Sequence, residues 1–435
     1  MSSWQEFSVN SGIHLGVSEV LRDLAVNAFA LTTFPLEAVL LVSCFRIMGS
    51  ITHEFMTPAL ECVSIRSGVW AEILLSIPVS ISLSMPEIAL SIVGLFASDT
   101  STSHSLPIEA MLGGGWVSFL LIPGLSCWKG PLHLEWVPMA RDTISYSIMC
   151  LVILRAVGNG GISPMDSLLV MVQCVLYLMS MVLTQAMSRN ARLRAREQYL
   201  MMALKPIQEV VEQGEILGRL PMDLALSRGT TAVYQPLETC DSPPFVEDPR
   251  PARQSYSLST SGRMVSYFCV RALPGTSSER LYFLTVVNAF VIYMGLSYIV
   301  CNVGIRWTSV ISPGFPSHIV GPIVLGLLSQ LGELVRSATA TTDQARAHVV
   351  STALSSQVYS VGLGLGLPWM VRGFWSEHKL EVNQALIEKC VIISLIAVGV
   401  FSVYCLIHAG KDMELKSGKW LIFGYVFLCF IFSLT

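Results

Sequence analysis

Long apolar runs, separated by short polar stretches, recur along most of the chain. A helix needs about 20 mostly apolar residues to cross the hydrocarbon core of a bilayer, and ten runs approach that length. They lie near 30–50, 70–97, 108–128, 143–157 and 165–187, and again near 281–303, 317–340, 347–371, 389–409 and 419–434. The pattern predicts an all-α membrane protein with ten transmembrane helices.

One long polar stretch divides the ten runs into two groups of five. Residues 188–280 are rich in proline, contain a serine-rich patch at 255–262 and have little periodicity, which is typical of a linker without a packed core. The predicted organisation is therefore an N-terminal segment at 1–27, a first five-helix repeat at 28–187, a loop at 188–280 and a second five-helix repeat at 281–435.

Arginines at both ends of this loop predict the orientation of the chain. Basic residues near span ends favour the cytosol, so we expect the central loop to be cytosolic. Five spans in each half then insert the halves in opposite directions. Two inverted repeats are typical of transporters that bind their substrate near the midplane. The arginines are Arg189, Arg192, Arg194, Arg196, Arg263, Arg271 and Arg280.

Composition supports a membrane protein and excludes several classes of function. Hydrophobic residues make up 52% of the chain and charged residues only 13%, against roughly 25% charged in globular domains. The net charge of −3 gives no indication of a nucleic-acid partner. The 11 cysteines are scattered without a C-x-x-C pair, so we interpret them as small core residues.

The second predicted helix of each group carries an acidic residue near its middle. Glu87 follows Pro86, and Glu333 follows Gly332, with Pro322 upstream in the same helix. A lone charge at the bilayer centre costs about 3 kcal/mol on insertion scales and usually marks a functional site. Either acid alone could instead be protonated or paired with a neighbouring helix. Two acids at matching positions of two repeats favour a functional site.

Oxygen atoms surround both acids in the sequence. Ser84 and Ser91 lie within about a turn of Glu87, and Ser329 and Ser337 lie near Glu333. Carboxylates, hydroxyls and backbone carbonyls freed by proline and glycine are hard ligands that suit Ca²⁺, and fewer of them satisfy Na⁺. No cysteine or histidine cluster accompanies the acids, which argues against a softer metal. Serine in membrane helices also serves in helix packing.

The motifs along the helices resemble those of the cation/calcium exchanger superfamily, and within it the potassium-dependent sodium/calcium exchangers. Residues 53–61 resemble DDFFVPxLE, 82–96 resemble GSSAPELFTSxIGVF, 113–118 resemble GSAVFN, 131–142 resemble PLxWxPLxRDxxFY, 314–321 resemble GIPDTVMG, 328–333 resemble GTSVPD, 355–360 resemble GSNxFD and 364–369 resemble GLPVPW. The motifs follow one another in family order through both groups of helices.

This resemblance implies a function and a set of site residues. Glu87 and Glu333 take the places of the two family acids that bind the transported cations. The implied activity is alternating-access antiport of Ca²⁺ against Na⁺ across a lipid bilayer, with no cofactor and no enzymatic reaction. A plasma membrane is favoured over a vacuolar or other internal membrane. Residues implied to line the same cavity are Ser84, Ser91, Ser118, Ser329, Ser337, Gln357 and Ser360.

Several residues depart from the family pattern. Ser360 replaces the aspartate associated with potassium dependence, which argues against K⁺ co-transport. Gly332 is similar to the mitochondrial-type cation/calcium exchangers. Arg336 lies three residues after Glu333, so it could pair with that acid or extend to the helix end. Arg336 and Glu54 are therefore expected modulators of the site.

These departures leave alternatives open. A proton could replace Na⁺ as the counter-ion, because burial favours the neutral form of a carboxyl group. The chain could also be a mitochondrial-type exchanger, or a transport-incompetent descendant that serves as a regulatory or structural partner in the membrane. An intramembrane enzyme is disfavoured, because His53 and Glu54 are not followed by a second histidine at metalloprotease spacing.

Overall fold

The structure is a computed structural model of the chain. It describes residues 33–60, 76–96, 101–159, 161–187, 194, 282–310, 317–375, 380, 382–408 and 413–434. Two compact units are distinguished, one formed by residues 1–184 with 265–435 and the other by 185–264. The first unit contains the helix bundle. Of the predicted central loop at 188–280, only Arg194 lies within the described residues.

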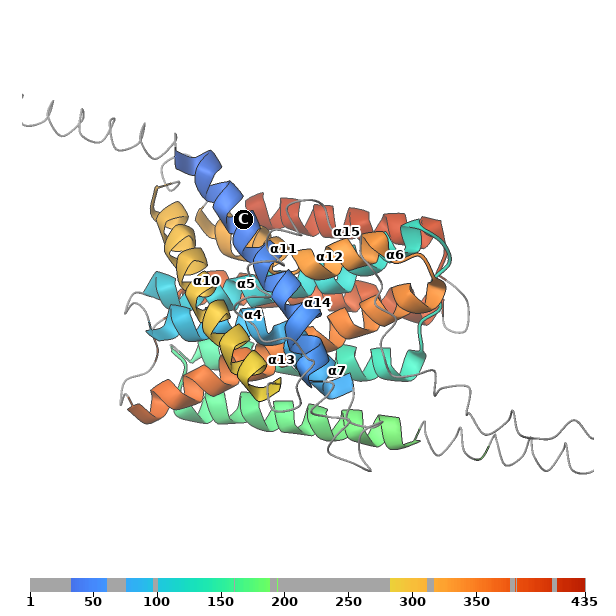
Figure 1. Cartoon of the computed structure of the whole chain (residues 1–435), viewed down its shortest axis with the longest axis horizontal. Coiled ribbons are helices and arrows are strands. Elements are labelled where there is room, and N and C mark those ends of the chain that lie inside the picture. Colours follow the sequence, from blue (N-terminus) through green and yellow to red (C-terminus); the bar gives the residue numbers. More distant parts are fainter. Residues whose placement is uncertain are drawn as a thin grey trace, which may run out of the picture. The chain divides into compact units, whose positions relative to one another are not determined.

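The bundle consists of two consecutive groups of helices (Figure 1). The first group comprises helix Thr33–Leu60, α4 (Ser76–Phe96), α5 (Ser101–Trp116) with η2 (Val117–Leu121) and α6 (Ile122–Trp128), α7 (Trp136–Gly158) and helix Pro164–Met187. The second comprises α10 (Tyr282–Val310), η5 (Ser317–Ile319) with η6 (Val320–Leu325), α11 (Gly326–Ser329) and α12 (Leu331–Thr339), then α13 (Asp343–Trp375), α14 (Gln384–Ile407) and α15 (Leu415–Leu434). The predicted all-α class is confirmed.

Most of these helices are long enough to span a membrane. Among the described residues, eight helices are long and apolar enough to cross a bilayer. The interrupted segment from η5 to α12 and the small-residue helix α13 occupy the other two predicted positions. The exact number of ten spans stays a prediction.

The outer faces of the bundle are apolar. Leu36, Met165 and Phe283 are 72%, 70% and 76% exposed, respectively, and many other large apolar side chains are also exposed. Contiguous exposed apolar surface of this kind marks contact with lipid or protein in folded chains. The described helices therefore present the surface that a bilayer requires.

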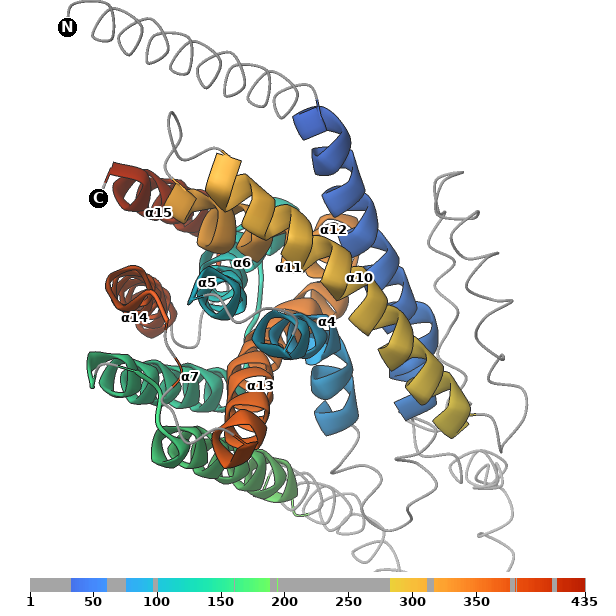
Figure 2. The same ribbon diagram turned by 90° about the vertical axis from the view of Figure 1, so that its left-hand side faces the viewer.

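Four interrupted or small-residue segments form the middle of the bundle. Helix α4 packs along α13, and α5 packs against η6 and α11 (Figure 2). The second contact is made by backbone atoms, because a Cβ added to Gly326 would lie 2.7 Å from the carbonyl carbon of Gly113. Only glycine allows so close an approach at this crossing.

Helix Thr33–Leu60 and α10 lie side by side in both views and run obliquely to the rest of the bundle (Figures 1 and 2). Glu37 joins them by accepting from Trp307 Nε1 at 2.7 Å and by an ion pair with Arg306 at 2.6 Å. Phe34 stacks on Trp307 with ring centroids 4.4 Å apart. We call Phe34, Glu37, Arg306 and Trp307 the peripheral clamp.

Three helices contain π-helical turns. They are η1 (Thr52–Met56) within helix Thr33–Leu60, η2 between α5 and α6, and η6 before α11. Such turns are rare and occur frequently at functional sites. The three turns contain or directly precede several of the polar residues described next.

Candidate cation-binding site

Glu87 lies on α4 directly after Pro86, and its side chain is only 2% exposed. The proline removes one backbone hydrogen bond of the helix, so it frees the carbonyl group one turn earlier. Glu87 Oε1 accepts from Gln330 Nε2 at 2.9 Å. Glu87 Oε2 is buried and has no hydrogen-bond partner in the described part of the chain. Half of this carboxylate is thus available to a ligand.

Gln330 occupies the break between α11 and α12. Its φ of −92° and ψ of 9° interrupt the helix, and the side chain reaches toward the middle of the bundle. While its amide nitrogen donates to Glu87, its Oε1 accepts from Ser118 Oγ at 3.2 Å. Gln330 therefore bridges the second helices of both groups to the π turn η2.

Gly114 on α5 faces the same polar group. A Cβ at this position would lie 3.2 Å from Ser329 Oγ, 3.4 Å from Gln330 Nε2 and 3.5 Å from Gln357 Oε1. The three side chains therefore converge on one small patch of backbone. Ser329 donates to Gly326 O at 3.0 Å. Both polar atoms of the Gln357 side chain lack hydrogen-bond partners within the described residues, although the residue is fully buried.

Ser360 lies one turn beyond Gln357 on α13. It is 1% exposed, and its hydroxyl has no hydrogen-bond partner among the residues that the structure describes. Two contacts fix its level relative to α4. Ser80 bonds Ser355 at 2.8 Å, and a Cβ on Gly364 would lie 3.6 Å from Ile88. Both residues lie between these contacts, Glu87 one residue before Ile88 and Ser360 four residues before Gly364, so their depths differ by about one helical turn.

Glu333 has surroundings that differ from those of Glu87. It lies on α12, 5% exposed, and both carboxylate oxygens lie 3.4 Å from Arg336 Nη1. His53 Nε2, from helix Thr33–Leu60, lies 3.4 Å from Glu333 Oε1. The ion pair that the sequence offered as one alternative for Arg336 is present, and Glu333 is occupied by two groups of the chain itself.

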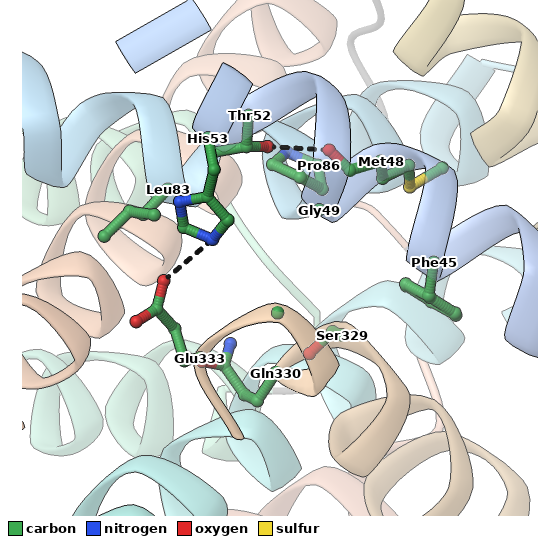
Figure 3. Close-up of a pocket in the computed structure, with 11 residues that line it drawn as sticks. Phe45, Met48, Gly49, Thr52, His53, Leu83, Pro86, Ser329, Gln330 and Glu333 are labelled. Carbon is green, nitrogen blue, oxygen red and sulfur yellow. Dashed lines mark hydrogen bonds and ion pairs between the residues drawn. The ribbon is translucent and has the colours of Figure 1, made fainter. Parts of the chain in front are cut away.

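A small pocket opens beside these residues (Figure 3). Its space for a water-sized particle is about 20 Å³, which is enough for roughly one water molecule. His53 points across it toward Glu333, and Ser329 and Gln330 lie at its edge (Figure 3). Apolar and small residues complete the lining, namely Phe45, Met48, Gly49, Leu83, Pro86 and Gly332, together with Thr52.

Not every predicted site residue joins this group. Ser84 is buried but donates to Ile81 O in its own helix at 2.9 Å. Ser91 is buried one turn beyond Glu87. Ser337 bonds Ser126 at 2.9 Å, which links α12 to α6. Glu54 is half-buried in η1, next to His53 in the sequence.

The structure brings together Glu87, Ser118, Ser329 and Gln357, with Gln330 between them. Ser360 lies one turn away on the same helix as Gln357. Glu333 faces the adjoining pocket. Buried carboxylate, amide and hydroxyl oxygens from four helices form a hard ligand set of the kind that binds Ca²⁺ or Na⁺.

Two residues of the site were not among those predicted. Gln330 lies in a segment that resembles the family motif. Its only signal in the sequence is that it is polar and lies three positions before the acid Glu333. His53 belongs to a different helix, 280 positions before Glu333 in the sequence. Its role as a contact of Glu333 depends on tertiary packing and has no local signature.

Comparisons with known proteins agree with this architecture. A sequence family described as "Sodium/calcium exchanger protein" matches residues 281–434, which is the second group of helices. No curated protein matches the chain by sequence. Among solved structures, the H⁺/Ca²⁺ exchanger CAX is 13% identical with a TM-score of 0.53, and the match covers 99% of this chain and 92% of that one.

Two further solved structures are similar over most of their length. YfkE in its native form is 12% identical with a TM-score of 0.49, covering 96% of this chain and 98% of that chain. The sodium–calcium exchanger NCX_Mj is 12% identical with a TM-score of 0.43, covering 90% and 97%. Of these three structures, only CAX has a TM-score above 0.5.

The long apolar helices are those of a multi-pass membrane protein. The second group of helices matches the sodium/calcium exchanger family, and the fold of the whole chain is similar to that of CAX. The resemblance stated from the sequence is thereby confirmed.

Proposed function

We propose that this protein is an antiporter that exchanges Ca²⁺ for Na⁺ across a membrane, with Glu87 and Glu333 as its principal cation ligands. The observation that supports this most strongly is the pair of buried carboxylates, one on α4 directly after Pro86 and one on α12 after the helix break at Gln330. Ser118, Ser329, Gln357 and Ser360 supply neutral oxygens. Ser84, Ser91 and Ser337 are assigned supporting positions nearby.

Alternating access would use the two parts of the bundle differently. The central helices hold the site, while helix Thr33–Leu60 and α10 move as a pair along them and expose it to one side at a time. Two observations support a pair that moves as one unit. The two helices run obliquely to the rest of the bundle, and the peripheral clamp joins them. The sodium gradient supplies the work, since one charge crossing 100 mV contributes about 2.3 kcal/mol.

The counter-ion and the membrane form the finer part of this proposal. Na⁺ is the leading counter-ion and H⁺ the alternative, because a buried carboxyl can also carry a proton. Ser360 in place of an aspartate argues against K⁺ co-transport. A plasma membrane is favoured over an internal one, with the loop at 188–280 in the cytosol. The four-part division of the chain at residues 27, 187 and 280 belongs to the same proposal.

The proposal is tested by Ca²⁺ flux in vesicles that contain the purified protein. An outward or inward Na⁺ gradient, an H⁺ gradient and added K⁺ are compared in turn. Glu87→Gln and Glu333→Gln should each reduce gradient-driven flux by more than about tenfold, because even outer-shell partners of a bound metal change affinity 10- to 100-fold. Glu135→Gln, an exposed acid before α7, is the matched control. Flux that is unchanged in both site variants would contradict the assignment.

A second candidate function is a transport-incompetent membrane partner. The observation that favours it is the contact of Glu333 with Arg336 and His53, which fills positions that a transported cation would occupy. Correctly folded wild-type protein that carries no Ca²⁺ under Na⁺, H⁺ or K⁺ gradients would support this candidate over antiport. Such an outcome would leave the fold unchanged and remove the transport activity.

A further inference from the structure

The two acids of the candidate site are not equivalent in charge. Glu333 forms an ion pair with Arg336, whose side chain is only 20% exposed. Glu87 is bonded by the neutral amide of Gln330. Counting two carboxylates and one guanidinium, the group carries a net charge of about −1. Glu87 is therefore the acid whose charge remains available to an ion.

Unsatisfied oxygens gather on the side of Glu87. Glu87 Oε2, Gln357 Oε1 and Ser360 Oγ are buried and lack hydrogen-bond partners in the described ranges. Buried polar atoms are nearly always paired in folded proteins, so these three atoms on α4 and α13 mark a candidate ligand site. One carboxylate oxygen and two neutral oxygens suit a cation of single charge.

We propose that Arg336 sets the valence preference of this site. A monovalent cation binds at Glu87 Oε2 with Gln357 and Ser360, and Arg336 acts as a tethered counter-charge that weakens Ca²⁺ relative to that cation. Ca²⁺ gains its second carboxylate only when Arg336 leaves Glu333. This inference rests on the proposed function, because it concerns the same site, and it identifies the residue that selects among substrates.

Electrostatics gives the size of the effect. A fixed positive charge repels a divalent ion twice as strongly as a monovalent one at the same distance. With a separation of roughly 6 Å and an effective dielectric constant of about 20, the difference corresponds to about a 100-fold change in relative affinity. Relaxation and water entry reduce this, so a change of about 10- to 100-fold is expected when the guanidinium is removed.

Equilibrium binding of radiolabelled Na⁺ and Ca²⁺ to the purified full-length protein in lipid nanodiscs tests the proposal, with Li⁺ and K⁺ as competitors. Arg336→Gln makes the net charge of the site more negative, about −2, and should increase the ratio of Ca²⁺ to Na⁺ affinity by at least about 10-fold. Arg336→Lys keeps the charge and should keep the wild-type ratio. Arg155→Gln, an exposed arginine on α7, is the matched control.

A double variant serves as a control for misfolding. Glu333→Gln with Arg336→Gln removes both partners of the ion pair and returns the net charge to about −1, so monovalent preference should return. An unchanged ratio in Arg336→Gln, with ion binding that still requires Glu87, would overturn the valence inference and leave the proposed antiport intact. If no variant binds an ion in a manner that depends on Glu87, both proposals fail.

Discussion

Glu87 and Glu333 are the same residue type at corresponding positions, yet the protein surrounds them differently. The amide of Gln330 bonds one oxygen of Glu87, and the charged Arg336 contacts both oxygens of Glu333. The sequence singled out both acids, because a carboxylate directly after a proline or a glycine in an apolar run is conspicuous. It left the partner of Arg336 open, since a long side chain can pair locally or extend to the helix end.

His53 illustrates the limit of sequence reasoning at the residue scale. Its contact with Glu333 joins helix Thr33–Leu60 to α12, and the backbones meet there as well, since a Cβ on Gly49 would lie 3.5 Å from Gly332 Cα. Proximity between residues so far apart along the chain is decided by packing. A single sequence contains no signal for it.

Gly113 provides a test of the backbone crossing at the centre of the bundle. A Cβ at this position would lie 1.8 Å from Pro322 O, so Gly113→Ala must force α5 and η6 apart. Overpacking of this kind costs about 1–3 kcal/mol or more. We expect a clearly lower melting temperature in detergent. Gly295→Ala on α10, where nothing lies within 4 Å, should not lower it. Equal effects in the two variants would mean that the crossing is not tightly packed.

At the scale of elements, the sequence indicated one helix break correctly, but α4 is continuous through Pro86, and the turns η1 and η2 were not predicted. Prolines and glycines in 317–340 indicated a broken helix, and the structure divides this segment into η5, η6, α11 and α12. The π turns η1 and η2 contain no proline at all. A π turn competes closely with regular α-helix, so packing against neighbouring helices decides its position.

The contribution of the peripheral clamp to the pairing of helix Thr33–Leu60 with α10 can be tested. If Glu37 and Trp307 stabilise the pairing of helix Thr33–Leu60 with α10, a double-mutant cycle of Glu37→Ala and Trp307→Phe should give a coupling free energy of about 1–2 kcal/mol. The free energies of unfolding are measured in detergent by thermal or denaturant titration. Glu37→Ala combined with Trp420→Phe on α15, an exposed tryptophan, should be additive. Additivity in the first cycle would show that the clamp contributes no pairwise stabilisation.

At the scale of the whole molecule, the two groups of helices were predictable because lipid imposes long apolar runs. Helix α13 and the segment from η5 to α12 are not among the eight described segments that are apolar enough to span by composition. The middle of α13, from Val349 to Gly366, is almost entirely buried, and neighbouring helices shield its small polar residues from lipid. A helix shielded in this way can cross the bundle without an apolar composition.

Two isolated β-bridges relate the loops to the predicted topology. Leu132 pairs with Met413, and Ile162 pairs with Leu380. If ten spans cross alternately from a cytosolic central loop, the first pair lies on the cytosolic side and the second on the opposite side. Each bridge thus joins two loops that the predicted topology places together, which is consistent with ten crossings.

Cysteine labelling tests this topology. Lys129 and Asn159 are exposed at opposite ends of the segment that contains α7. With reactive native cysteines replaced, Asn159→Cys should react with a membrane-impermeant maleimide on intact cells, and Lys129→Cys only after permeabilisation. The reverse pattern would place the central loop outside the cytosol. Reaction of both on intact cells would contradict the predicted crossing between them.

The π-helical turns have a consequence for how this chain is aligned with its relatives. Each π turn holds one more residue than an α-helical turn, and one residue corresponds to about 100° of rotation around a helix. If a relative lacks the turn at Val117–Leu121, an ungapped alignment pairs each residue beyond it with one that faces a different direction. Alignments of this chain should therefore be free to place single-residue gaps at 52–56, 117–121 and 320–325 before ligand positions are transferred.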